Sequence, residues 1–289
     1  MDCKKMKLHA KIGDIVHIIF LGDNHEGAKN HNKEKFIQAV NKIIEIRRKP
    51  GHHVVVVGMG DYIDCIHHKD NRFHPAEIAE KYEINDLKDL PNKQMETFLD
   101  DVRPIMDSFG AWLYGNHEMK YIKHNSSNPV KPIKYYYEYK MDEDMPILGE
   151  SGWLDLGIIR SNKNRKTPHF RFLVRMHHGT GGGGFREGYP INKVHDIFRW
   201  DIADIYCMGH LHQLATDAAP KKTFINGKEI IKKSLYGVTG CFLHKSRKGS
   251  HGYYEGKPGK YPLIGMLDAQ IKVGETKTDC ELKWDRLVF

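Results

Sequence analysis

Hydrophobic and polar residues are distributed in a way that predicts a strand, a helix and a second strand near the start of the chain. Residues 54–57 are four valines in a row, and such a run is typical of a strand buried on both faces. Residues 15–21 form another apolar run, and apolar positions at helical spacing follow from about residue 33 to 47. This order predicts that the two strands are parallel and adjacent.

In the middle of the chain, strands and helices continue to alternate, but less regularly. Apolar spacing predicts an amphipathic helix over 93–108, which Pro104 should kink or shorten because proline removes a backbone hydrogen bond. The tyrosines within 135–139 predict a half-buried strand and its neighbour, and a substrate-contacting insertion is the alternative for residues 119–150. Further elements are expected as helices over 76–82 and 191–200 and as strands over 112–114, 170–176 and 202–208.

Beyond residue 212 the pattern changes to that of antiparallel strands. Asn226-Gly227 predicts a type I′ hairpin turn within residues 224–230. Neither an internal repeat nor a linker rich in proline or serine divides the chain. We therefore expect a single domain, residues 1–289, that contains two sheets. The remaining strands are expected over 235–242, 262–273 and 281–288.

Composition agrees with a globular protein that has an ample core. The 289 residues are 40% hydrophobic with a mean hydropathy of -0.58, and no apolar run is long enough to span a bilayer. The first residues carry no apolar segment of a secretory leader. The five cysteines are scattered without a Cys-x-x-Cys pair, which favours reduced thiols. These features predict a cytoplasmic protein without a membrane partner.

Charge and histidine content narrow the class of partner. A formal net charge of +8 favours an anionic partner such as a phosphorylated substrate, a class that includes nucleic acid. The chain has 19 histidines, and their positions are more informative than their number. We expect most of them to lie on the surface or to be satisfied by neighbours.

Five short polar motifs follow directly after expected strands. Any one of them has an ordinary explanation as a turn or a helix cap. Because the carboxyl ends of the strands of one parallel sheet meet at one edge, the five together predict a shared site. Imidazole and carboxylate ligands suit Zn, Mn or Fe rather than Ca. The motifs are Asp23-x-His25, Gly60-Asp61-x-x-Asp64, Gly115-Asn116-His117-Glu118, His178-Gly179 and Gly209-His210-x-His212.

This set of motifs resembles the pattern of the calcineurin-like metallophosphoesterases. The family pattern is Asp-x-His, Gly-Asp-x-x-Asp, Gly-Asn-His-(Asp/Glu), His and Gly-His-x-His, and every piece is present between about residues 15 and 212. The resemblance implies an α/β (α+β) fold, a four-layer αββα sandwich with two mixed β-sheets. It also implies that the strands of residues 213–289 build the second sheet.

The resemblance further implies two divalent metal ions, Mn, Zn or Fe, and the residues that bind them. Asp61 would bridge the ions. His178 is preferred to His177 because family members place this ligand directly before glycine. His210 and His212, two residues apart on an extended segment, would share a face and reach neighbouring ions. The first ion would be completed by Asp23, His25 and His212, and the second by Asn116, His178 and His210.

In the implied reaction, a hydroxide activated by the two metal ions attacks phosphorus, and no phosphoenzyme forms. His117 would be the general acid that protonates the departing oxygen. Asp64 would pair with His117 and hold its ring. For Glu118 we expect a structural role at least as much as a catalytic one.

Departures from the family pattern bear on the substrate. The protein Ser/Thr phosphatases of the family carry arginines that hold the phosphate, at positions where this chain has Cys65 and Tyr114. This difference and the positive charge favour a phosphodiester, with nucleic-acid strands (a nuclease) or cyclic nucleotides as candidates. One alternative is a phosphomonoesterase that acts on a small metabolite or a phosphoprotein. The other is a non-catalytic scaffold, which the retention of every ligand disfavours.

Two further features of the sequence allow more than one interpretation. The glycines of 181–184 could form a flexible turn, approach a phosphate with their backbone amides, or act as a lid. They are not a P-loop, because the Gly-Lys-Ser/Thr ending is missing. His67, His68 and His74 follow Asp64 in the chain, and surface positions are the expectation for all three.

Overall fold

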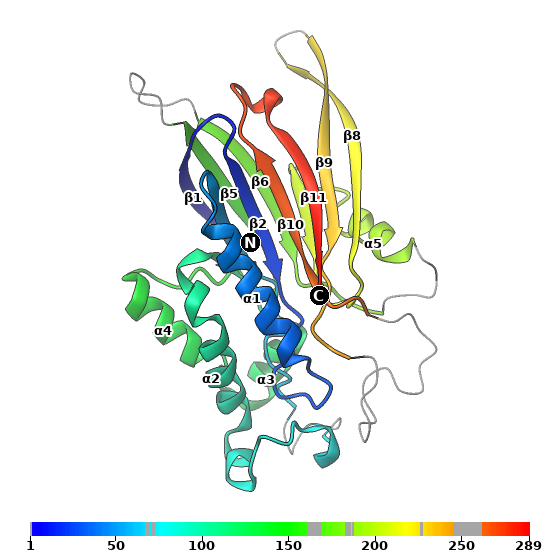
Figure 1. Ribbon diagram of the computed structural model, residues 1–289. Helices are drawn as coiled ribbons and strands as arrows, with labels where there is room; N and C mark the ends of the chain where they lie inside the picture. The colour runs from blue at the N-terminus through cyan, green and yellow to red at the C-terminus, as the bar shows by residue number, and fades with distance from the viewer. Residues whose placement is uncertain are drawn as a thin grey trace.

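Two mixed β-sheets face each other in the computed structural model, with helices on their outer sides (Figure 1). The structure describes residues 2–66, 70, 73–160, 169–182, 186, 188–225, 228–244 and 262–289. Within these residues it contains five α-helices and eleven strands. The predicted αββα arrangement with two mixed sheets is confirmed.

The first sheet has five strands, β2 (Ile15–Leu21), β3 (His52–Gly58), β4 (Phe109–Trp112), β10 (Gly265–Lys272) and β11 (Glu281–Val288). They are arranged in the order β11-β10-β2-β3-β4. β2 and β3 pair in parallel, as predicted, and the helix α1 (Lys33–Arg47) connects them. β4 extends the parallel arrangement, whereas β10 runs antiparallel to β2.

The second sheet has six strands, β1 (Asp2–Ala10), β5 (Ser151–Arg160), β6 (His169–His177), β7 (Ile205–Met208), β8 (Ala215–Ile225) and β9 (Lys228–Val238). Their order is β1-β5-β6-β7-β9-β8, and β6, β7 and β9 are mutually parallel. β8 and β9 pair antiparallel, as expected for a hairpin. The predicted turn residues Asn226 and Gly227 lie outside the described residues.

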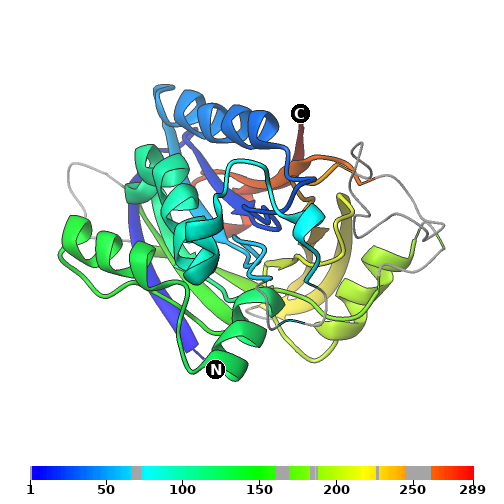
Figure 2. The ribbon, with the colours of Figure 1, turned by 90° about the horizontal axis from the view of Figure 1, so that it is seen from below.

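Helices cover the outer faces of both sheets. The first sheet packs against α1, α2 (Leu90–Val102) and α4 (Lys131–Met141), and the second against α5 (Tyr189–Ile197). The helix α3 (Asn116–Asn125) begins shortly after β4. Figure 2 looks at this end of the molecule and shows α1 and α5 on opposite sides of it. In the part of the chain that the structure describes, no helix has the length and apolar character needed to cross a membrane.

Alternating side chains divide the core into two layers. On β2, Ile18 faces the second sheet, whereas Ile19 packs against the helices. On β3, Val55 and Val57 face the second sheet and Val56 faces the helices. All three valines are 0% exposed, so the prediction that this strand is buried on both faces is confirmed.

Several element ends differ from the expectations. Pro104 shortens the second helix as predicted, because α2 ends at Val102 and a 3₁₀ helix, Arg103–Ser108, leads to β4. The helix expected over 76–82 is reduced to a 3₁₀ turn at Pro75–Glu77. The strand expected over 112–114 begins earlier, at Phe109, and ends at Trp112. β1 and β5 were not predicted.

The tyrosine-rich segment is helical, so the prediction of a strand there was wrong. Ile133 and Tyr137 lie four residues apart in α4 and are buried, whereas Tyr135 and Tyr139 are 64% and 88% exposed. Pro132 stands in the first turn of this helix, a position that proline favours. The helical spacing of the buried residues outweighs the preference of aromatic residues for strands.

The sequence predicts that the polar motifs lie at the edge of one parallel sheet, and this prediction was wrong. β2, β3 and β4 belong to the first sheet, whereas β6 and β7 belong to the second. The strands after residue 212 are also divided, because β8 and β9 join the second sheet and β10 and β11 the first. The motifs converge because the central parallel strands of both sheets end at the same end of the sandwich.

Candidate metal centre

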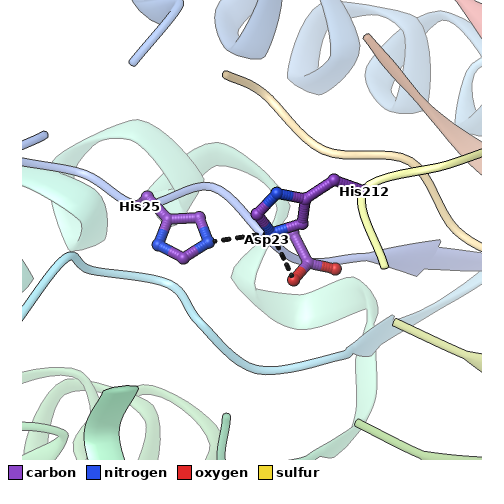
Figure 3. A group of neighbouring side chains, drawn as sticks. All are labelled: Asp23, His25 and His212. Carbon is purple, nitrogen blue, oxygen red and sulfur yellow. Dashed lines mark hydrogen bonds and ion pairs between the residues drawn. The ribbon is translucent and has the colours of Figure 1, made fainter. Parts of the chain in front are cut away.

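One group of candidate ligands follows β2 and β7. His25 Nε2 lies 3.2 Å from His212 Nε2, and His212 Nε2 lies 3.3 Å from Asp23 Oδ1. Figure 3 shows the two imidazoles and the Asp23 carboxylate turned toward one another. All three residues are buried, and their ligand atoms are close enough to share one metal ion.

A second group is assembled from the ends of β3, β6 and β7 and from the start of α3. Asp61, His178 and His210 have ligand atoms within reach of one ion. One atom of the Asn116 side-chain amide lies 3.0 Å from His178 Nε2, 3.2 Å from Asp61 Oδ2 and 2.7 Å from His210 Nδ1. With its NH₂ group at that position the amide donates to these atoms. With its oxygen there, the amide adds a fourth electron-pair donor to those of Asp61, His178 and His210, and a cation requires such a set of ligands.

Asp61 lies between the two groups. Its Oδ2 is 3.3 Å from His178 Nε2 in the second group and 3.7 Å from His25 Nε2 in the first. The same carboxylate oxygen therefore faces an imidazole of each group. This is the position that a carboxylate shared by two ions would need.

Backbone carbonyls orient two of the imidazoles. His178 Nδ1 donates to the carbonyl of Met59 at 2.7 Å, and His210 Nε2 donates to the carbonyl of Gly181 at 2.9 Å. Because a carbonyl only accepts, each ring keeps its proton on that side and turns its other nitrogen toward the Asn116 amide. Such contacts are typical of metal-binding histidines.

Neither carbonyl was indicated by the sequence, because a backbone group leaves no signal in residue type. The contact with Gly181 places the described start of the glycine run beside His210. Gly183 and Gly184 lie outside the described residues, and so do His67 and His68. His74 is exposed, as expected.

The charges of the centre favour a bound cation. Burial alone would lower the pKa of His178, but the negative charges of Asp61 and Asp23 raise it to about 10. Burial would raise the pKa of Asp61, yet the positive charges of His178 and His117 hold it well below its usual value. Burial lowers the pKa of His25 well below its usual value, and the charge of His117 acts in the same direction.

The ligands lie in unusual backbone conformations. Of the eight non-glycine residues with positive φ among the described residues, five are candidate ligands. Strained conformations of this kind gather at functional sites, where surrounding contacts hold them. The argument that His210 and His212 lie on an extended segment was therefore wrong, although each ring does enter a different group. The five are Asp23 (φ 50°), His25 (50°), Asp61 (49°), His210 (68°) and His212 (54°).

Glu118 supports the turn that carries Asp61. Its Oε2 accepts the N–H groups of Asp61 at 3.0 Å and Gly115 at 2.8 Å, and its Oε1 accepts those of Tyr62 at 2.8 Å and Ile63 at 3.3 Å. Burial and the charge of Asp61 raise the pKa of Glu118 to about 7. The four N–H donors explain why a carboxylate stands here.

Gly115 gives the Asp61 carboxylate its space. A Cβ atom at Gly115 would lie 2.0 Å from Asp61 Oδ1, a distance that no side chain can adopt. The glycine before Asn116 is therefore needed for the close approach of the backbone to the carboxylate.

His117 contacts Asp64 mainly through the backbone. His117 Nδ1 donates to the Asp64 carbonyl at 2.5 Å, whereas Asp64 Oδ1 lies 3.8 Å from the same nitrogen and 3.9 Å from His25 Nδ1. The predicted pairing of His117 with Asp64 thus involves the carbonyl more closely than the carboxylate. The ring of His117 also meets that of His25 edge-on, with centroids 4.6 Å apart.

Of the two adjacent histidines, the structure brings His178 into the centre. His177 instead accepts the N–H of Gly179 through Nδ1 at 2.7 Å. Burial, together with the charge of Arg175, lowers the pKa of His177 to about 4. His177 therefore belongs to the support of the turn that follows His178.

We predict that Glu118→Gln weakens both the fold and metal binding. The amide NH₂ would face backbone donors, which leaves buried N–H groups unpaired and lowers the free energy of unfolding by about 2 kcal/mol or more. The loosened Asp61 turn should lower the affinity for Mn²⁺ by about tenfold or more. Urea unfolding in EDTA and calorimetric titration with Mn²⁺ measure the two effects.

The matched control is Glu96→Gln on α2, where the exposed Glu96 forms an ion pair with Lys93. It should change the unfolding free energy by less than about 0.5 kcal/mol. Unchanged Mn²⁺ affinity in a folded Glu118→Gln variant would show that Glu118 does not position the centre.

Comparison with solved structures gives weak overall likeness. Vps29 from Entamoeba histolytica, solved in complex with Zn²⁺, is 12% identical with a TM-score of 0.35, covering 94% of this chain and 98% of that one. A predicted phosphoesterase from Streptococcus pneumoniae is 12% identical with a TM-score of 0.33, covering 95% of this chain and 98% of that one. Likenesses at this level carry no argument about function. Among curated proteins, none matches this chain.

The family comparison is decisive. The model of the calcineurin-like phosphoesterases matches residues 16–214, which is more than half of the chain. The matched region runs from β2 to the segment after His212 and so contains every candidate ligand described above. This chain belongs to the calcineurin-like phosphoesterase family.

Proposed function

We propose that the protein hydrolyses phosphodiesters with two divalent metal ions, of Mn, Zn or Fe. The family supports a hydrolase of phosphate esters, and the His and Asp clusters support metal dependence. The observation that carries the two-ion proposal is the place of Asp61, whose Oδ2 faces His178 at 3.3 Å and His25 at 3.7 Å. When bound, two such ions activate a water molecule and neutralise charge on the phosphoryl oxygens.

The donor set fits these metals. Imidazole nitrogens, carboxylate oxygens and one amide oxygen are ligands of Zn, Mn and Fe, whereas Ca prefers oxygen alone. Asp61 would be shared. Asp23, His25 and His212 would hold the first ion, and Asn116, His178 and His210 the second.

His117 is the proposed general acid. Its Nδ1 donates to the Asp64 carbonyl, which can only accept, so Nδ1 keeps its proton in both charge states of the ring. The proton that His117 can give to a departing oxygen is therefore the one on Nε2. Asp64 acts as a positioning residue, because its carbonyl orients the ring.

The proposed preference for a diester rests on Cys65 and Tyr114, which occupy the positions of the phosphate-binding arginines of the protein phosphatases. Cys65 is 2% exposed, and the hydroxyl of Tyr114 accepts a hydrogen bond from Asn128 at 2.9 Å. Neither position offers a guanidinium to a second phosphate charge, and a diester carries one charge fewer than a monoester. The net charge of +8 is consistent with a polyanionic substrate such as a nucleic-acid strand.

A reducing compartment such as the cytoplasm completes the proposal. None of the five cysteines, all of which the structure describes, forms a disulfide, and Cys65, Cys207 and Cys241 are buried. Free cysteines of this kind are usual where glutathione keeps thiols reduced.

We predict that the Mn²⁺-loaded protein has a higher kcat/KM for bis-p-nitrophenyl phosphate than for p-nitrophenyl phosphate. The two esters share a leaving group and differ in charge, so their comparison isolates the number of phosphate charges that the site accommodates. Release of p-nitrophenol measures both rates. Preference for the monoester would contradict the diesterase assignment and favour a phosphomonoesterase.

We also predict that His117→Ala slows hydrolysis of a diester with a poor leaving group, such as a phenyl ester, by about 10²–10⁴-fold. The p-nitrophenyl ester should lose much less, because its departing oxygen needs little protonation. The exposed His124 on the same helix provides the control His124→Ala, which should keep wild-type rates. Equal losses with both leaving groups would exclude His117 as the general acid.

A further inference from the structure

A pocket of about 580 Å³ lies at the other end of the sandwich from the metal centre. Both sheets line it, through β6 and β9 on one side and β11 with the preceding turn, Lys277–Asp279, on the other. In Figure 1 this turn lies at the start of β11, away from the end where β2 points. Strand β6 leads from Phe172 in the pocket to His178 in the centre, six residues or about 20 Å away. The pocket is therefore separate from the metal centre.

The pocket opens where the two sheets stop touching. Further along β9 the sheets are in close contact, since a Cβ atom at Gly237 would lie 2.8 Å from the ring of Trp284 on β11. At the pocket, Phe172 is buried, Leu282 is half-buried and Ile231 is 63% exposed. These side chains offer apolar surface to a ligand.

The polar part of the lining is positively charged. It contains four lysines and two carboxylates. Each carboxylate already has a lysine partner: Asp204 Oδ2 lies 2.8 Å from Lys277 Nζ, and Glu281 Oε1 lies 3.5 Å from Lys272 Nζ outside the pocket. Lys277 is further fixed over the ring of Phe172, 4.9 Å from its centroid.

One lysine of the lining is available to a ligand between the sheets. Lys233 shares a face of β9 with Leu235, which belongs to the core between the sheets, whereas Lys232 is on the outer face. Lys283 is also on an outer face, because its neighbour Leu282 on β11 faces the core. Among the described residues, Lys233 forms no ion pair. Uncompensated charge of one sign beside an apolar floor attracts an anion that also has an apolar part.

We propose that this pocket binds an amphiphilic anion, a phosphate or carboxylate group attached to an apolar body. The anionic group contacts Lys233, and the apolar body lies on Phe172, Ile231 and Leu282. A volume of about 580 Å³ is within the range of small-molecule sites, so one such molecule fits. A nucleotide and a fatty acid both have this chemistry. The site is independent of the proposed phosphodiesterase activity.

The test is calorimetric titration of the full-length, Mn²⁺-loaded protein with adenosine 5′-monophosphate and, separately, with decanoate. Each titration is repeated with the Asp61→Ala variant, which separates binding in the pocket from binding at the metal centre. We expect at least one of the two probes to bind with one molecule per chain. Lys233→Glu should weaken that binding by about tenfold or more, because attraction is replaced by repulsion. Lys283→Glu, the same charge change on the outer face of β11, should weaken it much less.

Lys7→Glu, an equal charge change at an exposed position of β1, is the control and should bind as the wild type does. Hydrolysis of bis-p-nitrophenyl phosphate should be unchanged in all three lysine variants, which separates this site from the metal centre. Binding of the nucleotide alone or of decanoate alone identifies the source of the ligand. Absence of binding by both probes, or binding that Lys233→Glu does not weaken, would overturn the proposal.

Discussion

The candidate metal centre depends on one carboxylate that lies between candidate ligands from two sheets. Asp61 follows β3 of the first sheet, and its Oδ2 faces His178, which follows β6 of the second sheet, at 3.3 Å. It reaches this place with φ at 49°, a conformation that costs on the order of 1–3 kcal/mol for a residue other than glycine. Hydrogen bonds from its own turn to Glu118 stabilise the conformation.

The sandwich makes such local strain tolerable. A continuous apolar core fills the space between the sheets, and a second one lies between the first sheet and its helices. These buried layers hold the strand ends in place, so five candidate ligands can occupy left-handed conformations at one end of the molecule. The same pairing of sheets leaves a pocket at the other end, where the inward positions of β9 include Lys233 and the exposed Ile231. The two sheets thus pack tightly in the middle of the sandwich and leave one candidate site at each of its ends.

Much of the site could be predicted from the sequence because its residues follow strands with clear apolar signals. The valines of β3 and the apolar run of β2 identify both strands, and the motifs after them identify Asp61 and Asp23. What one sequence could not give was the partition into sheets, because strand order depends on contacts between distant segments. The convergence of His178 with Asp61 was predicted from a single parallel sheet, whereas the two residues follow strands of different sheets.

Other errors arose where local patterns were weak or competed. Inward residues of β5, Leu154, Leu156 and Ile158, alternate with an acid and a glycine, so the period of a half-buried strand was present and was overlooked. The edge strand β1 was also overlooked, because lysines separate its apolar residues and an edge strand tolerates such charge. In α4 a run of tyrosines suggested a strand, although the buried Ile133 and Tyr137 have helical spacing. Tertiary contacts decided each case.

The central claim is that Asp61 serves two metal ions at once, and metal content tests it most directly. Mn²⁺ bound after equilibrium dialysis should be two ions per chain for the wild type. Asp23→Ala and His178→Ala should each retain the ion of the other group, whereas Asp61→Ala should weaken both, with circular dichroism confirming the fold of every variant. A single ion in the wild type, or an Asp61→Ala variant that loses only one of two, would contradict the account.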